Sequence, residues 1–292
     1  MRRIVSAQVA ASWLLVIVPC VWLYAPVIAK LVHDWTHDEN YSHGFLIVPL
    51  AMFFAWERRQ RLAGTPNAPS WAGLLVVLAA LALVVVGTLG AELFLTRVSL
   101  IVMMAGALLF LHGWGHLRIL GWPLAFLLLM IPLPAIVFNQ IAFPLQLLAS
   151  RVGTTAIQAC AVPVLREGNV IILANTSLEV ADACSGIRSL ISLLTLGIVY
   201  GYFADPRPWM RAVIALATIP IAIAANAARV AGTGVLAHYY GPQAAEGFFH
   251  TFSGWLVFVV AFLMLFVLVR ALARLWPIVP PYRSPSAAGV RA

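Results

Sequence analysis

Charged residues are scarce in this chain: they make up 10% of its 292 residues, whereas hydrophobic residues make up 63%. The mean hydropathy of +0.97 lies far outside the range of soluble globular proteins. A helix needs about 20 mostly apolar residues to cross about 30 Å of hydrocarbon, and several apolar runs approach that length. The scarcity of charge therefore excludes an ordinary soluble domain and predicts a polytopic protein of the lipid bilayer.

A basic stripe with interleaved aromatic residues is also lacking, although the formal net charge is +8. Lys and Arg occur in short clusters between apolar runs, a pattern that excludes a nucleic-acid partner. The chain has neither an internal repeat nor a Ser/Gly linker, so we expect one membrane domain over residues 1–276. The remaining residues, 277–292, are rich in Pro, Ser and Ala and are predicted to form a disordered cytoplasmic tail.

The apolar runs predict an all-α fold of about eight transmembrane helices. The first run is longer than the hydrophobic region of a typical signal peptide, so we expect an uncleaved anchor. The runs cover residues 9–29, 44–56, 71–90, 98–111, 119–137, 185–203, 212–236 and 251–271.

Basic residues set the expected orientation, because short loops rich in Lys and Arg stay in the cytoplasm. In an eight-helix arrangement most of them fall on one side, which predicts that both termini are cytoplasmic. The residues on that side are Arg2, Arg3, Arg58, Arg59, Arg61, Arg118, Arg207, Arg211, Arg270, Arg274, Arg283 and Arg291.

Residues 138–183 are expected to stay outside the membrane on the opposite side. Their first part carries polar residues at three- and four-residue steps, which predicts a helix lying in the interface. Short apolar runs at residues 170–173 and 177–180 follow, and turn residues separate them. We therefore predict a small extracytoplasmic β-hairpin just before the helix that carries a cysteine. The polar stripe consists of Gln140, Gln146, Ser150, Arg151, Thr154, Thr155 and Gln158.

The stretch "VADACSGIRSL", residues 180–190, places reactive groups at the outer end of the predicted span 185–203. Asp182 and Cys184 lie at its mouth, and Arg188 follows Cys184 by four residues, so it lies on the same helical face. A guanidinium at that depth is costly unless it meets an acid, carbonyl groups or water. The alternative is that Arg188 extends to the outer headgroups.

Two further stretches carry polar residues near the same leaflet. In "NAARVAGTG", Asn226 and Arg229 are three residues apart on one face of the span 212–236. In "EGFFHTFSGW", Glu246, His250 and Gly254 share a face, and the carboxylate would fix the histidine tautomer. The alternatives are an arginine that holds helices together through backbone carbonyls and a histidine that only packs between helices.

Taken together, Cys184, Arg229 and His250 come from successive spans and lie near one leaflet. A nearby cation favours the thiolate form of a cysteine, which is the nucleophilic form. A histidine can give a proton to a departing amine. These residue types predict acyl transfer through a thioester.

The sequence around these residues resembles the Cys, Arg and His blocks of the exosortase family. The resemblance also includes "ENYSHGFLIVPL" (residues 39–50) and "VPVLREGNVI" (residues 162–171), so it covers nearly the whole chain. It implies a bacterial inner-membrane transpeptidase whose active site faces the periplasm. By this resemblance Cys184 is the nucleophile, Arg229 the electrostatic stabiliser and His250 the proton donor.

The resemblance also implies the partner. Exosortases process exported proteins with a PEP-CTERM signal, in which a Pro-Glu-Pro segment precedes a hydrophobic helix and a basic tail. Such a substrate would bind through its own transmembrane helix, and an acceptor of unknown identity would release it. The family is linked to exopolysaccharide export. Arg188, Asn226, Glu246, Asp182 and His43 are expected to support the site, and no cofactor or metal is expected.

The sequence leaves three further alternatives open, for a metal site, for a disulfide and for the class of function. The acidic and histidine side chains of "HDWTHD", residues 33–38, could bind zinc, although a loop offers no fixed face for the ligands. Cys160 is also predicted outside and could form a disulfide with Cys184. A non-enzymatic transporter or polysaccharide-export component would instead use Arg188 and Arg229 to line a solute path.

Overall fold

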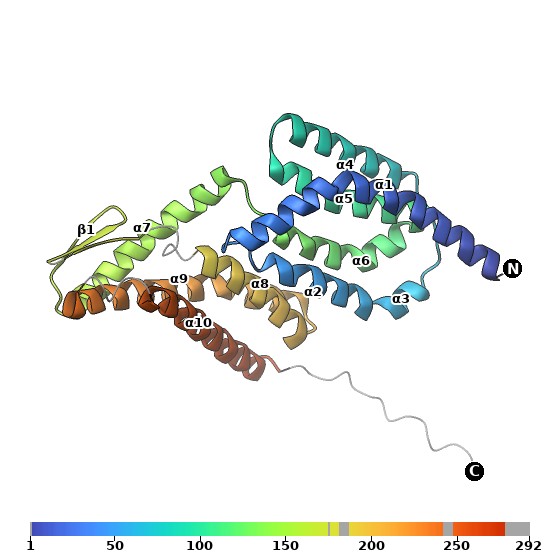
Figure 1. The fold of residues 1–292 in the computed structure, drawn as a ribbon. Helices are drawn as coiled ribbons and strands as arrows, with labels where there is room; N and C mark the ends of the chain where they lie inside the picture. The colour runs from blue at the N-terminus through green and yellow to red at the C-terminus, as the bar shows by residue number, and fades with distance from the viewer. Residues whose placement is uncertain (1, 175, 181–186, 242–247, 278–292) are drawn as a thin grey trace, which may run out of the picture. The chain divides into compact units, whose positions relative to one another are not determined.

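The computed structural model describes residues 2–174, 176–180, 187–241 and 248–277, with only the backbone for residues 2–17, 187, 248–251 and 253. The described chain is mostly helical (Figure 1). Five of its helices are long and apolar enough to cross a membrane, and shorter apolar helices accompany them. The all-α polytopic membrane fold is therefore confirmed. Contacts divide the chain into two compact units, Met1–Ile141 and Ala142–Ala292.

The first unit is built around an antiparallel pair of helices, α4 and α5, that lie side by side (Figure 1). Glycine lets their backbones approach: a Cβ atom at Gly73 would lie 2.2 Å from the Phe110 backbone nitrogen. At Gly106 it would lie 2.9 Å from the Val77 nitrogen. The elements of this unit are α1 (Arg2–His37), α2 (Gly44–Glu57), α3 (Arg59–Ala63), α4 (Ala72–Leu89), α5 (Leu93–His112), α6 (Trp114–Phe126), the 3-10 turn η1 (Leu127–Met130) and the start of α7 (Ala135–Ala159).

Helix α1 continues beyond the predicted span 9–29 and ends at His37. The stretch "HDWTHD", expected to be a loop, is therefore helical through residue 37. Buried aromatic residues attach this helix to the unit, since the Tyr24 hydroxyl donates to Ser99 Oγ at 3.1 Å and Trp35 Nε1 donates to the Met130 carbonyl at 2.9 Å. Both contacts satisfy polar atoms that have no access to water.

The predicted span 119–137 agrees with the structure in its first part only: an apolar helical segment covers Trp114–Met130, and the chain then leaves the helix. Helix α6 ends at Phe126, η1 ends at Met130, and α7 begins at Ala135. The intervening sequence contains Pro132 and Pro134, each of which lacks a backbone N–H and clashes with the preceding turn of a helix. The Leu133 N–H between them donates to the Tyr41 hydroxyl at 3.3 Å.

The described residues of the second unit form two hydrophobic cores. One lies between α7, the sheet and α9, with Ile157 and Ile171 at 0% exposure. The other lies between α8, α9 and α10, with Leu193 and Leu265 at 0%. The elements after α7 are β1 (Val164–Glu167), β2 (Val170–Leu173), β3 (Ser177–Glu179), α8 (Ile187–Ala204), α9 (Pro208–Tyr240) and α10 (Phe248–Leu275).

The sheet before α8 has three antiparallel strands in the order β1-β2-β3. Two of them, β2 and β3, lie at the two apolar runs from which a hairpin was predicted, and β1 adds a strand in front. Strand β2 turns Ile171 and Leu173 into the core, so alternate residues face α7 and α9. The extracytoplasmic position of the sheet stays a prediction.

The polar residues predicted as a stripe over 140–158 lie on about one half of α7, since successive residues on a helix point about 100° apart. One edge of this wide stripe is buried and the other is exposed. Gln146, Ser150 and Thr154, spaced four residues apart, are buried, whereas Arg151 and Thr155 are exposed. The Ser150 hydroxyl donates to the Gly168 carbonyl at 2.9 Å and joins α7 to the turn between β1 and β2.

Helix α7 is also one of the five helices that are long and apolar enough to cross a membrane. Its expected position in the interface, the count of eight transmembrane helices and the cytoplasmic termini stay predictions. The same holds for the single domain over residues 1–276, since the contacts define two units.

Replacing Gly73 by Ala is expected to lower the melting temperature of the purified protein in detergent. The added methyl would overlap the Phe110 backbone, which cannot rotate away, and overpacking of this kind costs about 1–3 kcal/mol. Gly121→Ala in α6 is the matched control, because a Cβ atom there meets nothing within 4 Å. That variant should be as stable as the wild type or more stable. Equal melting temperatures for the two variants would contradict close packing of α4 on α5.

Candidate active site

Arg229 lies on α9, and its guanidinium rests on the backbone of α10. A Cβ atom at Gly254 would lie 3.5 Å from Arg229 Nη2 and 3.6 Å from Cζ, which is ordinary van der Waals contact. His250 precedes Gly254 by four residues on α10 and therefore shares its face. The structure thus brings the Arg229 guanidinium to the turn of α10 that carries His250.

The rotation of α9 about its axis is set by its contacts with α7. A Cβ atom at Gly153 would lie 2.6 Å from Val230 Cγ1, and one at Gly234 would lie 2.4 Å from Ile157 Cδ1. Successive residues on a helix point about 100° apart. Because Val230 fits against α7 at Gly153, its neighbour Arg229 is directed away from α7 and towards α10.

Asn226 lies one turn before Arg229 and is 2% exposed. Around it, α9 carries the buried small residues Ala222 and Ala225 of the core shared with α8 and α10. A buried amide in such a core needs hydrogen-bond partners. The role of Asn226 in supporting the site stays a prediction.

Arg188 is the second residue of α8 and is partly exposed. Helix α8 packs against α9 at another glycine, where a Cβ atom at Gly197 would lie 2.4 Å from Thr218 Cγ2. The helices α8, α9 and α10, which carry or adjoin the predicted site residues, therefore pack together within the second unit.

Cys184, Asp182 and Glu246 lie outside the described residues, and of His250 only the backbone is described. Their roles as nucleophile, supporting acids and proton donor stay predictions. Cys160 is exposed directly after α7 and forms no disulfide with a described residue. Its pairing with Cys184 is likewise untested.

His43 belongs to the first unit, directly before α2. One ring nitrogen, Nε2, is 3.2 Å from the Leu129 carbonyl oxygen. Burial lowers the pKa of His43, and hydrogen bonds to backbone carbonyls offset this only in part. A lowered pKa keeps the ring neutral near pH 7. Its supporting role in the site stays a prediction.

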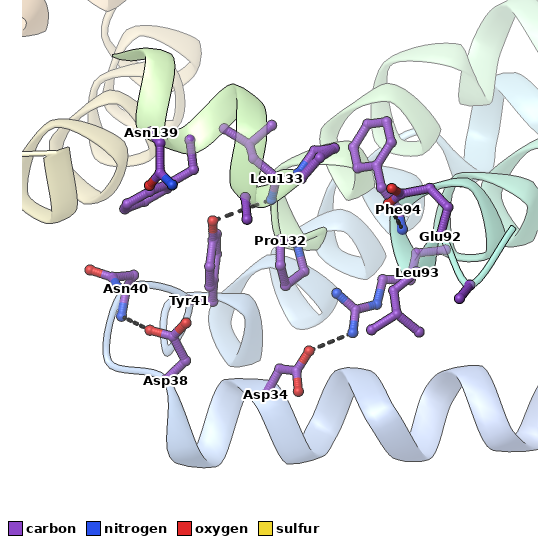
Figure 2. A pocket seen from close by; sticks show the side chains of 15 residues that line it. Asp34, Asp38, Asn40, Tyr41, Glu92, Leu93, Phe94, Pro132, Leu133 and Asn139 are labelled. Carbon is purple, nitrogen blue, oxygen red and sulfur yellow. Dashed lines mark hydrogen bonds and ion pairs between the residues drawn. The ribbon is translucent and has the colours of Figure 1, made fainter. Parts of the chain in front are cut away.

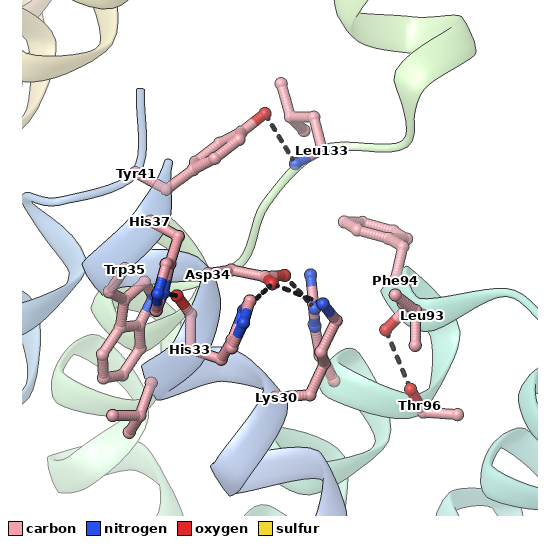
Figure 3. Close-up of polar contacts among 12 residues, drawn as sticks. Lys30, His33, Asp34, Trp35, His37, Tyr41, Leu93, Phe94, Thr96 and Leu133 are labelled. Atoms are coloured by element: carbon pink, nitrogen blue, oxygen red, sulfur yellow. Dashed lines mark hydrogen bonds and ion pairs between the residues drawn. The ribbon is translucent and has the colours of Figure 1, made fainter. Parts of the chain in front are cut away.

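The zinc alternative for residues 33–38 finds no support in the described part of the chain, which holds no group of three His, Cys, Asp or Glu side chains arranged around a metal. Asp34 is engaged by cations instead (Figure 3). It forms an ion pair with Arg97, and Lys30 Nζ is 2.9 Å from its Oδ1. Sequence analysis missed the pair with Arg97, because 63 residues separate the partners and no local pattern relates them.

Comparison of the sequence with known protein families gives a match over most of the chain. Residues 35–267 match the transmembrane exosortase family, which is most of the chain and includes Cys184, Arg229 and His250. The chain belongs to the exosortase family. No curated protein and no solved structure matches it.

Family membership confirms the resemblance noted in the sequence. Exosortases are membrane cysteine transpeptidases, so this exosortase has, in general terms, the role of a membrane transpeptidase acting on protein substrates. Together with its apolar helices, membership also makes it a multi-pass membrane protein.

Replacing Gly254 by Leu is expected to slow processing of a substrate protein by about 100-fold or more, as when a transition-state hydrogen-bond donor is lost. A leucine side chain would occupy the space of the Arg229 guanidinium, whereas the methyl of Gly254→Ala fits beside it. The measurement is the time course of the gel shift of a coexpressed substrate. Gly232→Leu is the matched control on α9, since nothing lies within 4 Å of a Cβ atom there. Full activity of Gly254→Leu would show that this contact is dispensable.

Proposed function

We propose that this exosortase cleaves the C-terminal signals of PEP-CTERM proteins through a thioester at Cys184 and transfers the product to an acceptor. Arg229 stabilises negative charge, and His250 moves the proton. The enzyme acts in the bacterial inner membrane with its active site facing the periplasm, in support of exopolysaccharide export.

The observation that carries this proposal is the contact between Arg229 and the turn of α10 that carries His250. The Arg229 guanidinium from α9 lies beside the turn of α10 whose backbone includes His250, which supports a shared site for these two residue types. The family match, which includes the Cys184 block, supports the third. Cys184 precedes the first residue of α8, Ile187, by three positions, and α8 packs on both α9 and α10.

The chemistry follows from these residue types. The Cys184 thiolate attacks the scissile carbonyl carbon, and the N–H groups of a nearby guanidinium stabilise the oxyanion that forms. His250 then protonates the departing amine, the C–N bond breaks, and a thioester remains. An acceptor with an N–H or O–H group attacks the thioester, gives its proton to His250 and restores the thiolate.

The substrate would approach from within the membrane. Its own hydrophobic helix would pack laterally against the helices of this exosortase and hold the Pro-Glu-Pro segment at the outer surface. Tethering of this kind makes the attack effectively unimolecular, which lowers the entropic part of the barrier.

The transporter alternative makes a different prediction, because a solute path lined by Arg188 and Arg229 needs no thiol. Membership in a family of cysteine transpeptidases favours the enzyme.

Replacing Cys184 by Ala is expected to abolish removal of the C-terminal tail from a coexpressed PEP-CTERM protein. The measurement is gel mobility and intact mass of that protein in membranes. With the wild type, a product heavier than the hydrolysed chain identifies an attached acceptor, and a product of the hydrolysed mass identifies water as the acceptor.

Cys160→Ala is the matched control, since Cys160 is a second cysteine of the same unit and is exposed. It should process the substrate at the wild-type rate. Processing that persists in Cys184→Ala would contradict the thioester and favour transport. Loss of processing in Cys160→Ala, with normal expression, would instead indicate a disulfide that the fold requires.

A further inference from the structure

The first unit contains a cavity of about 360 Å³, with both polar and apolar side chains in its lining, that the proposed chemistry does not use (Figure 2). This volume lies within the range of about 300–1,000 Å³ typical of small-molecule sites. Four separate parts of the chain form it: the end of α1, residues 38–41, the start of α5 and residues 132–139. All of them belong to the unit Met1–Ile141.

A buried arginine lies in the wall of this cavity. Arg97 is 3% exposed and forms an ion pair with Asp34, which also lines the cavity. Among the described residues, Asp34 is the only group to which the Arg97 guanidinium donates a hydrogen bond. A guanidinium has five N–H donors, so several are left for a ligand that offers oxygen acceptors. In a membrane protein a buried ionisable side chain of this kind marks a functional site.

Hydrogen-bond acceptors surround the same space. Asp38 and Glu92 line the cavity, and each accepts one backbone hydrogen bond, from the N–H of Asn40 at 2.8 Å and of Phe94 at 3.1 Å respectively. A carboxylate offers about four lone-pair positions, so both can accept further hydrogen bonds. Figure 2 shows Asp38, Asn40 and Glu92 in this wall.

Aromatic and proline rings form the rest of the lining, among them Tyr41, Phe94, Phe138 and Pro132. The Tyr41 hydroxyl accepts the N–H of Leu133, which leaves its own hydrogen for a ligand. Asn139, from the first turns of α7, adds an amide that both donates and accepts.

The charges disfavour strongly charged ligands. Arg97 and Lys30 both pair with Asp34, and Asp38 and Glu92 add two carboxylates, so the formal charge around the cavity stays negative and disfavours a phosphate or sulfate. An ammonium group could bind the carboxylates, but Arg97 would repel it. It also carries no acceptor for the N–H groups of Arg97. A neutral ligand whose groups both donate and accept fits every part of the lining.

We propose that this cavity binds a carbohydrate. A sugar has a hydroxyl on nearly every carbon, and such a density of donors and acceptors matches carboxylates, an amide and a guanidinium within one small space. Its C–H faces pack against the rings of Tyr41 and Phe138. The site lies in the first unit and does not depend on the chemistry proposed for Cys184, so either proposal can fail alone.

The test is saturation-transfer NMR on the purified full-length protein with the methyl glycosides of glucose, galactose and N-acetylglucosamine. The protein is held in lauryldimethylamine oxide, a detergent without a sugar headgroup. We expect transfer to at least one of the three sugars, with a Kd of about 1–10 mM. No transfer to any of them would overturn the proposal.

Two variants locate the binding. Asp38→Asn keeps the acceptor for the Asn40 N–H but removes a charge, and Asn139→Ala removes an amide. Each should raise the Kd about tenfold, as expected for the loss of one good hydrogen bond. Glu39→Gln and Asn67→Ala are the matched controls, since both positions are exposed and outside the cavity lining. Equal Kd values in variants and controls would place the sugar elsewhere.

A Pro-Glu-Pro peptide is the third probe, because a peptide also carries donors and acceptors. The result against the proposal would be saturation transfer to the peptide but to none of the sugars, with the peptide signal lost in Asp38→Asn. It would replace the carbohydrate by a peptide as the ligand of this cavity. Melting temperatures of all variants within the wild-type range establish that the lost binding is local.

Discussion

Close packing of helices at glycine, against a neighbouring backbone or side chain, is the constraint on which both units depend. Lipid is as apolar as the helix surfaces, so burial from water does not drive helices together in a bilayer, and van der Waals packing has to do so. Glycine makes that packing close. Gly73 admits α5 against α4, and Gly153 and Gly234 admit α9 against α7. A side chain at any of these positions would separate the helices that meet there, and at Gly153 and Gly234 it would displace α9, which carries Arg229.

The same packing decides where cationic side chains go. An arginine in a membrane protein is costly unless it has a partner. Arg97 has an acid from another helix, and the Arg229 guanidinium lies beside α10, where Gly254 leaves space for it. The first arrangement forms the wall of a cavity, and the second brings a guanidinium to the turn that carries His250. Among the described residues, these two arginines thus mark two places where polar chemistry is possible.

Much of the architecture was predictable from local patterns. Composition predicted the polytopic class, and the apolar runs predicted most helices, since both depend on residues near one another in the chain. The prediction for residues 119–137 extended too far, because Pro132 and Pro134 were read as part of an apolar run, whereas the apolar helical segment covers Trp114–Met130. Which edge of the polar stripe on α7 is buried was not predictable, because it depends on what packs against that helix.

The sequence by itself determined the membrane class, the family, and the Cys, Arg and His blocks, because each is a pattern within a short stretch of chain. Only the tertiary structure decided which partners those stretches meet. The pairing of Asp34 with Arg97 and the contact of Arg229 with Gly254 join residues from different helices. Such contacts depend on how far each helix can rotate and approach before atoms overlap, and that is a property of the packed helices rather than of any one segment.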